Sequence, residues 1–229
     1  MFFSDSFLLL KKLFKIRVVL KLCVLKFDSN KNDEMIFSSN FNKEIFMFYT
    51  IDIDGLKRDL QLFPVSDDTQ IAALVLFGDV ELTEHCAKKL LERAPEFDII
   101  LTAEAKSIPL AYEMARLAGM NDYVVARKVQ KVYMGDTVQA SLQSITTKGA
   151  QKLYLGRDDF KKLANRRVLI VDDVVSTGDS LKALEMLVDT AHGNIVGKMA
   201  ILEEGESQNR ADVITLGELP LFDAQGSAK

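Results

Sequence analysis

Two patterns of apolar residues alternate along the chain. One is the continuous apolar run of a buried strand, and the other is the regular spacing of apolar residues on one face of a helix. The continuous apolar run 168–171 predicts a buried strand. Leu82, Cys86 and Leu90 recur at helical spacing. Extended segments are predicted at 48–51, 71–76, 98–101, 123–126, 168–171 and 195–202, and helices at 53–60, 82–93, 107–118 and 181–191. This alternation predicts an α/β fold: a Rossmann-like parallel sheet with helices on both faces and ligands at the carboxyl ends of the strands.

One segment interrupts the alternation of strands and helices. Residues 138–145 and 152–155 read as the two strands of a hairpin around the turn residues 146–149. A hairpin inserted between two strand–helix units is expected to project from the sheet as a flexible flap. The 229 residues, 48% of them hydrophobic, are enough for one well-buried domain.

The first part of the chain differs in composition from the rest. Residues 1–54 contain no Ala, Gly or Pro and hold 9 of the 14 Phe. The apolar run 7–27 carries six basic residues, which excludes a membrane span and does not fit a signal peptide. A basic helix lying on a membrane surface remains an alternative. We expect residues 1–46 to be an atypical extension outside the functional fold, and residues 47–229 to form the functional domain.

Charge and rare residues exclude several classes of function. The net charge of −4 argues against general nucleic-acid binding, which normally shows a basic excess. Cys23 and Cys86 match no metal spacing or disulfide framework, and this favours a reducing, cytoplasmic setting. His85 falls in the helix predicted at 82–93 and His192 at the end of the one predicted at 181–191, so a catalytic triad or a zinc site is not expected.

Candidate chemistry is concentrated in residues 168–180. Asp172 and Asp173 follow the apolar run, and a small polar loop then leads into the helix predicted from residue 181. Backbone N–H groups at a helix start, beside Ser and Thr hydroxyls, suit a phosphate group. The two carboxylates can accept hydrogen bonds from neighbouring hydroxyls, such as those of a ribose. The segment therefore predicts a site for a ribose 5-phosphate.

This segment resembles the motif of type I phosphoribosyltransferases that binds phosphoribosyl pyrophosphate (PRPP). The resemblance implies that Asp172 and Asp173 act at the ribose. It also implies a 5′-phosphate loop, made of Val175, Ser176, Thr177, Gly178, Asp179 and Ser180. Many family members have Gly where this chain has Asp179, which is a mild departure.

Two further segments resemble the adenine branch of the family. The loop Glu104, Ala105, Lys106 and Ser107 is similar to an E-A-R-G loop that contacts pyrophosphate, with Lys in place of Arg and Ser in place of Gly. Arg127, Lys128 and Lys131 are similar to an R-K-x-x-K motif whose cations meet the pyrophosphate. Residues 62–64 and 71–81 resemble the variable hood that covers the base. A solvated basic loop is the alternative reading of 127–131.

The flap departs from the adenine branch, whose flap carries a glutamate placed to assist the base. The matching residues 141–146 contain no carboxylate. General acid–base assistance to the base is therefore absent, or it comes from residues outside the flap, or the acceptor is a base other than adenine.

The resemblance implies a type I phosphoribosyltransferase fold and transfer of the 5-phosphoribosyl group from PRPP to a purine base in purine salvage. Adenine, giving AMP, is the favoured acceptor. It also implies Mg²⁺ held by PRPP without direct protein ligands, and a homodimer without nucleic-acid or membrane partners. Xanthine or another nucleobase is the alternative acceptor, and a non-catalytic PRPP-sensing regulator is the alternative class of function.

Removal of residues 1–46 tests the expected domain boundary. A chain beginning at Met47 should keep the thermal unfolding midpoint of the full chain, because the predicted elements follow that residue. Differential scanning calorimetry of the two chains measures this. A shorter chain that is insoluble would show that the extension is structural. Vesicle binding by the full chain alone would favour the membrane-surface reading.

Overall fold

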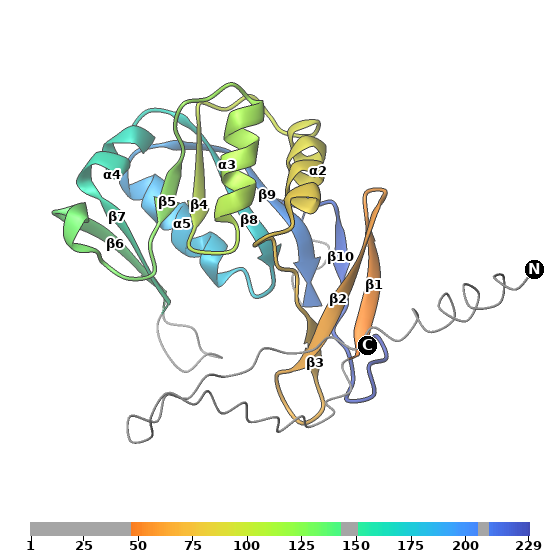
Figure 1. Ribbon diagram of the computed structural model, residues 1–229. Coiled ribbons are helices and arrows are strands. Elements are labelled where there is room, and N and C mark those ends of the chain that lie inside the picture. Colours follow the sequence, from red (N-terminus) through yellow and green to blue (C-terminus); the bar gives the residue numbers. More distant parts are fainter. Residues whose placement is uncertain (1–46, 143–150, 206–210) are drawn as a thin grey trace, which may run out of the picture. The chain divides into compact units, whose positions relative to one another are not determined.

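A five-stranded parallel sheet lies at the centre of the protein (Figure 1), in the strand order β10-β9-β8-β4-β5. The computed structural model describes residues 47–142, 151–205 and 211–229. In chain order the elements are β1 (Phe48–Ile53), β2 (Leu56–Pro64), β3 (Gln70–Ala72), α2 (Val80–Leu91), β4 (Ile99–Ala103), α3 (Ile108–Leu117), β5 (Val124–Ala126), η1 (Val132–Met134), β6 (Thr137–Leu142), β7 (Gln151–Gly156), α4 (Arg157–Leu163), β8 (Arg167–Val175), α5 (Asp179–Thr190), β9 (Asn194–Glu204) and β10 (Gly217–Leu219).

Helices cover both faces of this sheet, as the alternating pattern predicted (Figure 1). Successive residues of the central strand β8 belong to two different cores. Leu169 and Val171 pack in the core that contains α2 and α3, whereas Val168 and Ile170 pack in the core that contains α5. All four side chains are fully buried. A strand buried on both faces needs a continuous apolar run, which is the pattern at 168–171.

Residues 53–60 form a hairpin, so the predicted helix is wrong. β1 and β2 are antiparallel and meet at Ile53 and Leu56, which leaves Asp54 and Gly55 as a two-residue turn. Both turn residues have positive φ, 50° and 97°, and an Asp-Gly pair is favoured in such a turn. The preference of Asp54 and Gly55 for a tight turn therefore decides the local structure, although the flanking apolar residues are also spaced as in a helix.

Strands β1, β2 and β3 form a separate three-stranded sheet in the region expected to be the hood. The backbone N–H groups of Gln70 and Phe222 each donate to the other residue's carbonyl, at 2.8 and 2.9 Å. The ring of Phe222, 1% exposed, lies 4.9 Å from the ring of Tyr49. The chain's C-terminal segment therefore fastens this small sheet.

The predicted hairpin is present as β6 and β7, which pair from Thr137 opposite Gly156 to Leu142 opposite Gln151. Ala140, Leu153 and Leu155 are buried in the core that contains α5. Residues 143–150, where the flap would turn, lie outside the described residues, as does the proposed extension 1–46. The projecting, flexible flap stays a prediction.

Three other elements differ from expectation. Strand β8 continues to Val175, because Val174 and Val175 still pair with β9, so Asp172 and Asp173 lie within the strand and not beyond its end. Helix α4 and strand β10 were not predicted. Among the described residues, no helix has the length and apolar character to span a membrane.

The packing of α5 on the sheet can be tested by truncating its inward face. Leu184 is fully buried, whereas Met186 on the same helix is 41% exposed. Leu184→Ala should lower the free energy of unfolding by about 2–5 kcal/mol, because it leaves a cavity. Met186→Ala should change it by less than about 0.5 kcal/mol. Urea denaturation measures both variants. Equal effects would contradict the described packing.

Candidate functional site

The connections between strands diverge at the carboxyl ends of β4 and β8, and this edge of the sheet is here called the crevice. These strands are neighbours, yet the chain runs from β4 to β5 on one side, and β8 leads to β9 on the other. Ligands of open α/β sheets bind where the strand order reverses in this way. The loops that follow β4, β5 and β8 carry the residues predicted to bind PRPP.

Asp172 and Asp173 lie within the last four residues of the central strand β8 and are 7% and 6% exposed. The Asp173 backbone N–H donates to Asp172 Oδ1 at 2.9 Å. Burial, together with the charge of Asp173, raises the pKa of Asp172 to about 7, and the hydrogen bond from the Asp173 backbone N–H offsets part of that rise. Two carboxylates held this close favour a cation or hydroxyl groups beside them.

Lys106 supplies the cation nearest to this pair. Its Nζ lies 2.5 Å from Asp173 Oδ2 and 3.4 Å from the carbonyl oxygen of Leu74, and its side chain is 47% exposed. The ion pair therefore joins the loop after β4 to the end of β8. Since the lysine remains partly exposed, it can also face an anion in the crevice.

Glu104 and Ser107, in the same loop after β4, make hydrogen bonds and an ion pair with neighbouring parts of the chain. Glu104 Oε2 accepts a hydrogen bond from the Lys128 backbone N–H at 3.0 Å, and Glu104 Oε1 lies 3.1 Å from Arg127 Nη2. Ser107, 1% exposed, donates to the Ala103 carbonyl oxygen at 2.9 Å as α3 begins. Ala105 lies between these anchors and is exposed. Glu104 thus links the loops that follow β4 and β5.

Arg127 and the two lysines after it lie in different surroundings. Arg127 is paired with Glu104, and its backbone N–H and carbonyl group bond to Tyr154 in β7, at 2.9 and 2.8 Å. Lys128 is exposed, and Lys131 is half-buried where η1 begins. The structure brings Arg127 together with Glu104, and leaves Lys128 available to a ligand in solution.

The loop after β8 leads directly into the amino end of α5. Val175 is buried, Ser176 and Thr177 are exposed, and the buried Gly178 has φ of 78° at the position preceding the helix. A side chain would strain this backbone conformation. The Asp179 backbone N–H faces Thr177 Oγ1 at 3.4 Å, while Asp179 and Ser180 are half-buried in the first turn. The backbone N–H groups at the amino end of a helix can hold a phosphate.

Two carboxylates near the crevice were missed in the sequence. Glu203 and Glu204 end β9 and are 9% and 7% exposed. The Thr215 hydroxyl lies 3.2 Å from Glu203 Oε1, whereas Glu204 is hydrogen-bonded to Ser176 of the loop after β8. Burial raises the pKa of Glu204 above its usual range. The available signal was an acidic pair directly after an apolar run, the same pattern as Asp172 and Asp173.

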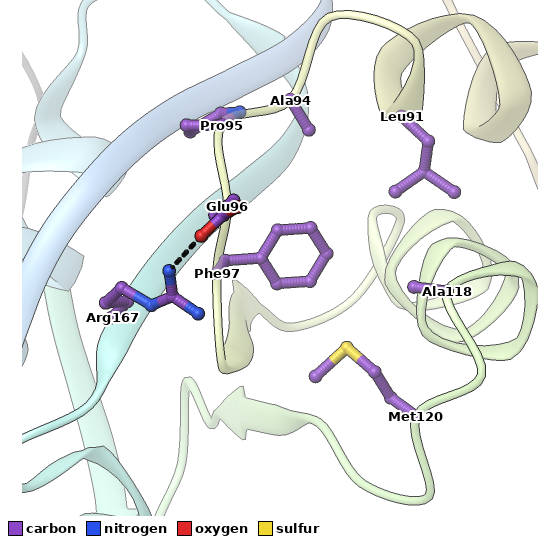
Figure 2. Close-up of a pocket in the computed structure, with 8 residues that line it drawn as sticks. All are labelled: Leu91, Ala94, Pro95, Glu96, Phe97, Ala118, Met120 and Arg167. Atoms are coloured by element: carbon purple, nitrogen blue, oxygen red, sulfur yellow. Dashed lines mark hydrogen bonds and ion pairs between the residues drawn. The ribbon is translucent and has the colours of Figure 1, made fainter.

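Two surface cavities lie away from these loops. The cavity in Figure 2 measures about 350 Å³ and lies at the amino ends of β4, β5 and β8. Arg167 borders it and is paired with Glu96 at 2.7 Å and Asp98 at 2.8 Å. A second cavity of about 430 Å³ lies between α2 and α3, beside Phe77 and Tyr112. Neither cavity coincides with the crevice at the carboxyl ends.

The chain is similar in sequence to phosphoribosyltransferases and to a transcriptional repressor. The family model "Phosphoribosyl transferase domain" matches residues 80–215. The purine biosynthesis transcriptional repressor PurR of Bacillus subtilis is 31% identical over 118 residues, which are 51% of this chain and only 40% of the repressor. Adenine phosphoribosyltransferase of Acetivibrio thermocellus is 28% identical over 156 residues, 67% of this chain and 88% of that protein.

A second curated relative and a solved structure are also phosphoribosyltransferases. Hypoxanthine/guanine phosphoribosyltransferase of Methanococcus voltae is 31% identical over 155 residues, 67% of this chain and 75% of that protein. Among solved structures, adenine phosphoribosyltransferase of Saccharomyces cerevisiae has a TM-score of 0.56 and 24% identity, covering 69% of this chain and 93% of that one. At this identity the structural likeness establishes the α/β fold.

The raised pKa of Asp172 predicts a specific dependence of stability on pH. Its usual value is 3.8 and its value in the folded protein is about 7, so the folded protein holds this proton more tightly than the unfolded chain does. The resulting stabilisation is complete below the usual value and is lost as pH rises through about 7. The advantage of Asp172→Asn over the unmodified protein should therefore grow from about pH 4 to about pH 8.

Urea denaturation at several pH values measures this difference. Asp67→Asn, an exposed residue between β2 and β3, is the control and should follow the unmodified protein throughout. A constant difference between Asp172→Asn and the unmodified protein across the pH range would show that folding does not perturb Asp172.

Proposed function

The chain belongs to the phosphoribosyl transferase domain family, and we propose that it transfers the 5-phosphoribosyl group of PRPP to a purine base, adenine being the favoured acceptor. The observation that carries this proposal is the arrangement of β8 and α5. Two buried carboxylates lie near the carboxyl end of the central strand, and a short polar loop after the strand leads to the amino end of a helix. Together they match the two ends of a ribose 5-phosphate.

The ribose and its phosphate occupy neighbouring parts of this arrangement. Asp172 and Asp173 accept hydrogen bonds from the ribose hydroxyls, and residues 175–180 hold the 5′-phosphate. Displacement at the anomeric carbon places positive charge on the sugar ring. The carboxylates stabilise that charge because they are fixed close to the sugar in a buried setting.

Departure of pyrophosphate is assisted by the basic groups on the loops after β4 and β5. Lys106 faces the crevice from beside Asp173, at 2.5 Å. Arg127, Lys128 and Lys131 add positive charge on the same side, and Glu104 holds Arg127 and the Lys128 backbone in place. Fixed cations favour the leaving group as its negative charge grows. Ala105 and Ser107 supply backbone groups at the start of α3.

Mg²⁺ is the proposed cofactor, bound through PRPP. The described residues contain no cluster of three or more His, Cys, Asp or Glu side chains that could hold a metal ion. Diphosphate and hydroxyl oxygens are ligands that Mg²⁺ prefers, and the ion commonly keeps few protein ligands. When bound, it would offset the negative charge of the diphosphate.

Adenine is the favoured acceptor because the segments 104–107 and 127–131 resemble the adenine branch. The matching part of the flap, 141–146, has no carboxylate, and general acid–base help is worth about 10²–10⁴-fold in rate. We therefore expect adenine turnover to be detectable but modest. Xanthine or another nucleobase is the alternative acceptor.

A PRPP-sensing regulator without turnover is the second candidate. The similarity to the repressor PurR over 118 residues favours it, as does the missing flap carboxylate. The overall net charge of −4 weighs against general nucleic-acid binding by this chain.

A homodimer is also proposed, in keeping with the resemblance. Phe77, Val80 and Tyr112 are each at least half exposed around the cavity between α2 and α3. Exposed apolar side chains gathered in this way are typical of surfaces that contact another protein. A second copy of the chain would cover them.

The Asp172→Asn/Asp173→Asn variant tests the proposed function. It should lose pyrophosphate release in a screen of nucleobases with Mg²⁺ and PRPP, and calorimetry should show much weaker PRPP binding, because the ribose hydroxyls lose their charged acceptors. Asp158→Asn/Asp159→Asn is the matched control, since it removes the same charge from the first turn of α4.

Three results of this screen would change the assignment. Unchanged PRPP affinity in the Asp172/Asp173 variant would remove the proposed site. Faster turnover of xanthine or guanine than of adenine would remove the adenine assignment. Tight PRPP binding without turnover of any base would favour the regulator.

A further inference from the structure

Glu204 is a buried carboxyl group beside the proposed phosphate loop, and the proposed reaction gives it no role. It is the last residue of β9 and is 7% exposed. Its side chain is hydrogen-bonded to the hydroxyl group of Ser176. The register of the sheet agrees with this contact, because Val175, the last residue of β8, is paired with Glu203 of β9. The residues that follow this pair, Ser176 and Glu204, are therefore neighbours.

Glu204 belongs to a paired strand, whereas Ser176 begins a loop. β9 lies between β8 and β10, and the apolar residue Leu219 of β10 is the partner of Glu204. Ser176 follows the end of β8 and is exposed. The other acid at the end of β9, Glu203, lies 3.2 Å from the Thr215 hydroxyl. A fixed acid thus meets a hydroxyl group on the loop that is proposed to hold the phosphate.

Lys106 is the charged side chain that acts on Glu204 from the loop after β4. Its ammonium group also lies 2.5 Å from Asp173 Oδ2, so two acids share one positive charge. Burial outweighs the contacts of Glu204 with Ser176 and Lys106, and it raises the pKa of Glu204 above its usual range. Another negative charge brought beside this carboxyl group would favour its protonated form further.

The proton on Glu204 decides what the Ser176 hydroxyl can do. A hydroxyl group carries one proton and donates one hydrogen bond. When Glu204 is ionised, it accepts that hydrogen bond, and the proton of Ser176 is directed away from a phosphate in the loop. When Glu204 is protonated, its own O–H can donate to Ser176 Oγ, and the Ser176 hydroxyl can donate to the phosphate. The negative charge of a bound phosphate favours this second arrangement.

We propose that Glu204 is a positioning residue for the 5′-phosphate, which takes up a proton when the phosphate binds and so turns the Ser176 hydroxyl toward it. The proton comes from solvent, and no covalent bond of the ligand forms or breaks. This inference rests on the phosphate-binding part of the proposed function. It applies equally to a transferase and to a PRPP-sensing regulator.

The test measures the affinity of the full chain for ribose 5-phosphate, which carries the sugar and its phosphate without the pyrophosphate. Calorimetry in phosphate-free buffers gives Kd for the unmodified protein and for Glu204→Gln. The amide of the variant can donate to Ser176 at every pH. The ratio of the unmodified Kd to the variant Kd should therefore rise from about pH 5 to about pH 8, by at most about tenfold per pH unit for one linked proton. Glu203→Gln is the matched control and should follow the unmodified protein.

The outcomes separate this inference from the function on which it rests. A ratio that does not change with pH would overturn the inference. Weaker binding by Glu204→Gln at every pH would also overturn it, because a support for the loop alone would behave in this way. PRPP binding without turnover of any base would overturn the transferase function and leave this inference standing. Failure of the unmodified protein to bind ribose 5-phosphate or PRPP would overturn both.

A second measurement avoids any substitution of a buried residue. Ser176 is exposed, and so Ser176→Ala leaves the packing of the core unchanged. Binding enthalpies in two buffers that differ in ionisation enthalpy give the number of protons taken up with ribose 5-phosphate. From about pH 5 to about pH 8 the unmodified protein should take up more protons than Ser176→Ala, because the hydroxyl group links the phosphate to Glu204. Equal uptake by the two proteins over this range would contradict the proposed link.

Discussion

The burial of two adjacent carboxylates at the end of the central strand constrains the rest of the site. Asp172 and Asp173 are almost completely removed from solvent, and a buried charge is costly unless it is paired. Lys106 pairs with Asp173 at 2.5 Å, which holds the loop after β4 against the end of β8. Glu104 in the same loop then binds Arg127 and the Lys128 backbone, which brings the loop after β5 into place. Compensation of the buried charge thus positions the neighbouring loops.

The same arrangement gathers the basic residues of the site on one side of the central strand. The basic residues lie on loops after β4 and β5, and the remaining buried acids end β9. Lys106 is still partly exposed although it is paired, so a bound anion would share it with Asp173. The Arg127 side chain pairs with Glu104, and its backbone is hydrogen-bonded to the backbone of Tyr154. These contacts hold the positive charge of Arg127 in a fixed position.

The sequence predicted the central architecture because the buried strands carry unambiguous apolar runs. The run 168–171 and the helix after it are both present, and so is the sheet with helices on both faces. The hairpin at Asp54 and Gly55 was mistaken for a helix because the apolar residues that flank the turn are also spaced as in a helix. Helix α4 was missed because it is short, with a single buried residue, Leu163.

The candidate site was predicted where several local signals agreed, as at residues 172–180. Its internal contacts could not be predicted, because they join loops far apart in the chain: Asp173 with Lys106, and Glu104 with Arg127. Glu204 was overlooked for the same reason. The acidic pair after the apolar run was visible in the sequence, but its partner Ser176 lies in another loop, so the pattern alone did not place the pair at the site.

A crystal structure of the protein with Mg²⁺ and PRPP tests the central claim most directly. The account predicts that the ribose hydroxyls contact Asp172 and Asp173, and that the 5′-phosphate contacts the amino end of α5. The pyrophosphate should lie toward Lys106. PRPP bound at the amino ends of the strands, or bound without contact to either aspartate, would contradict the account.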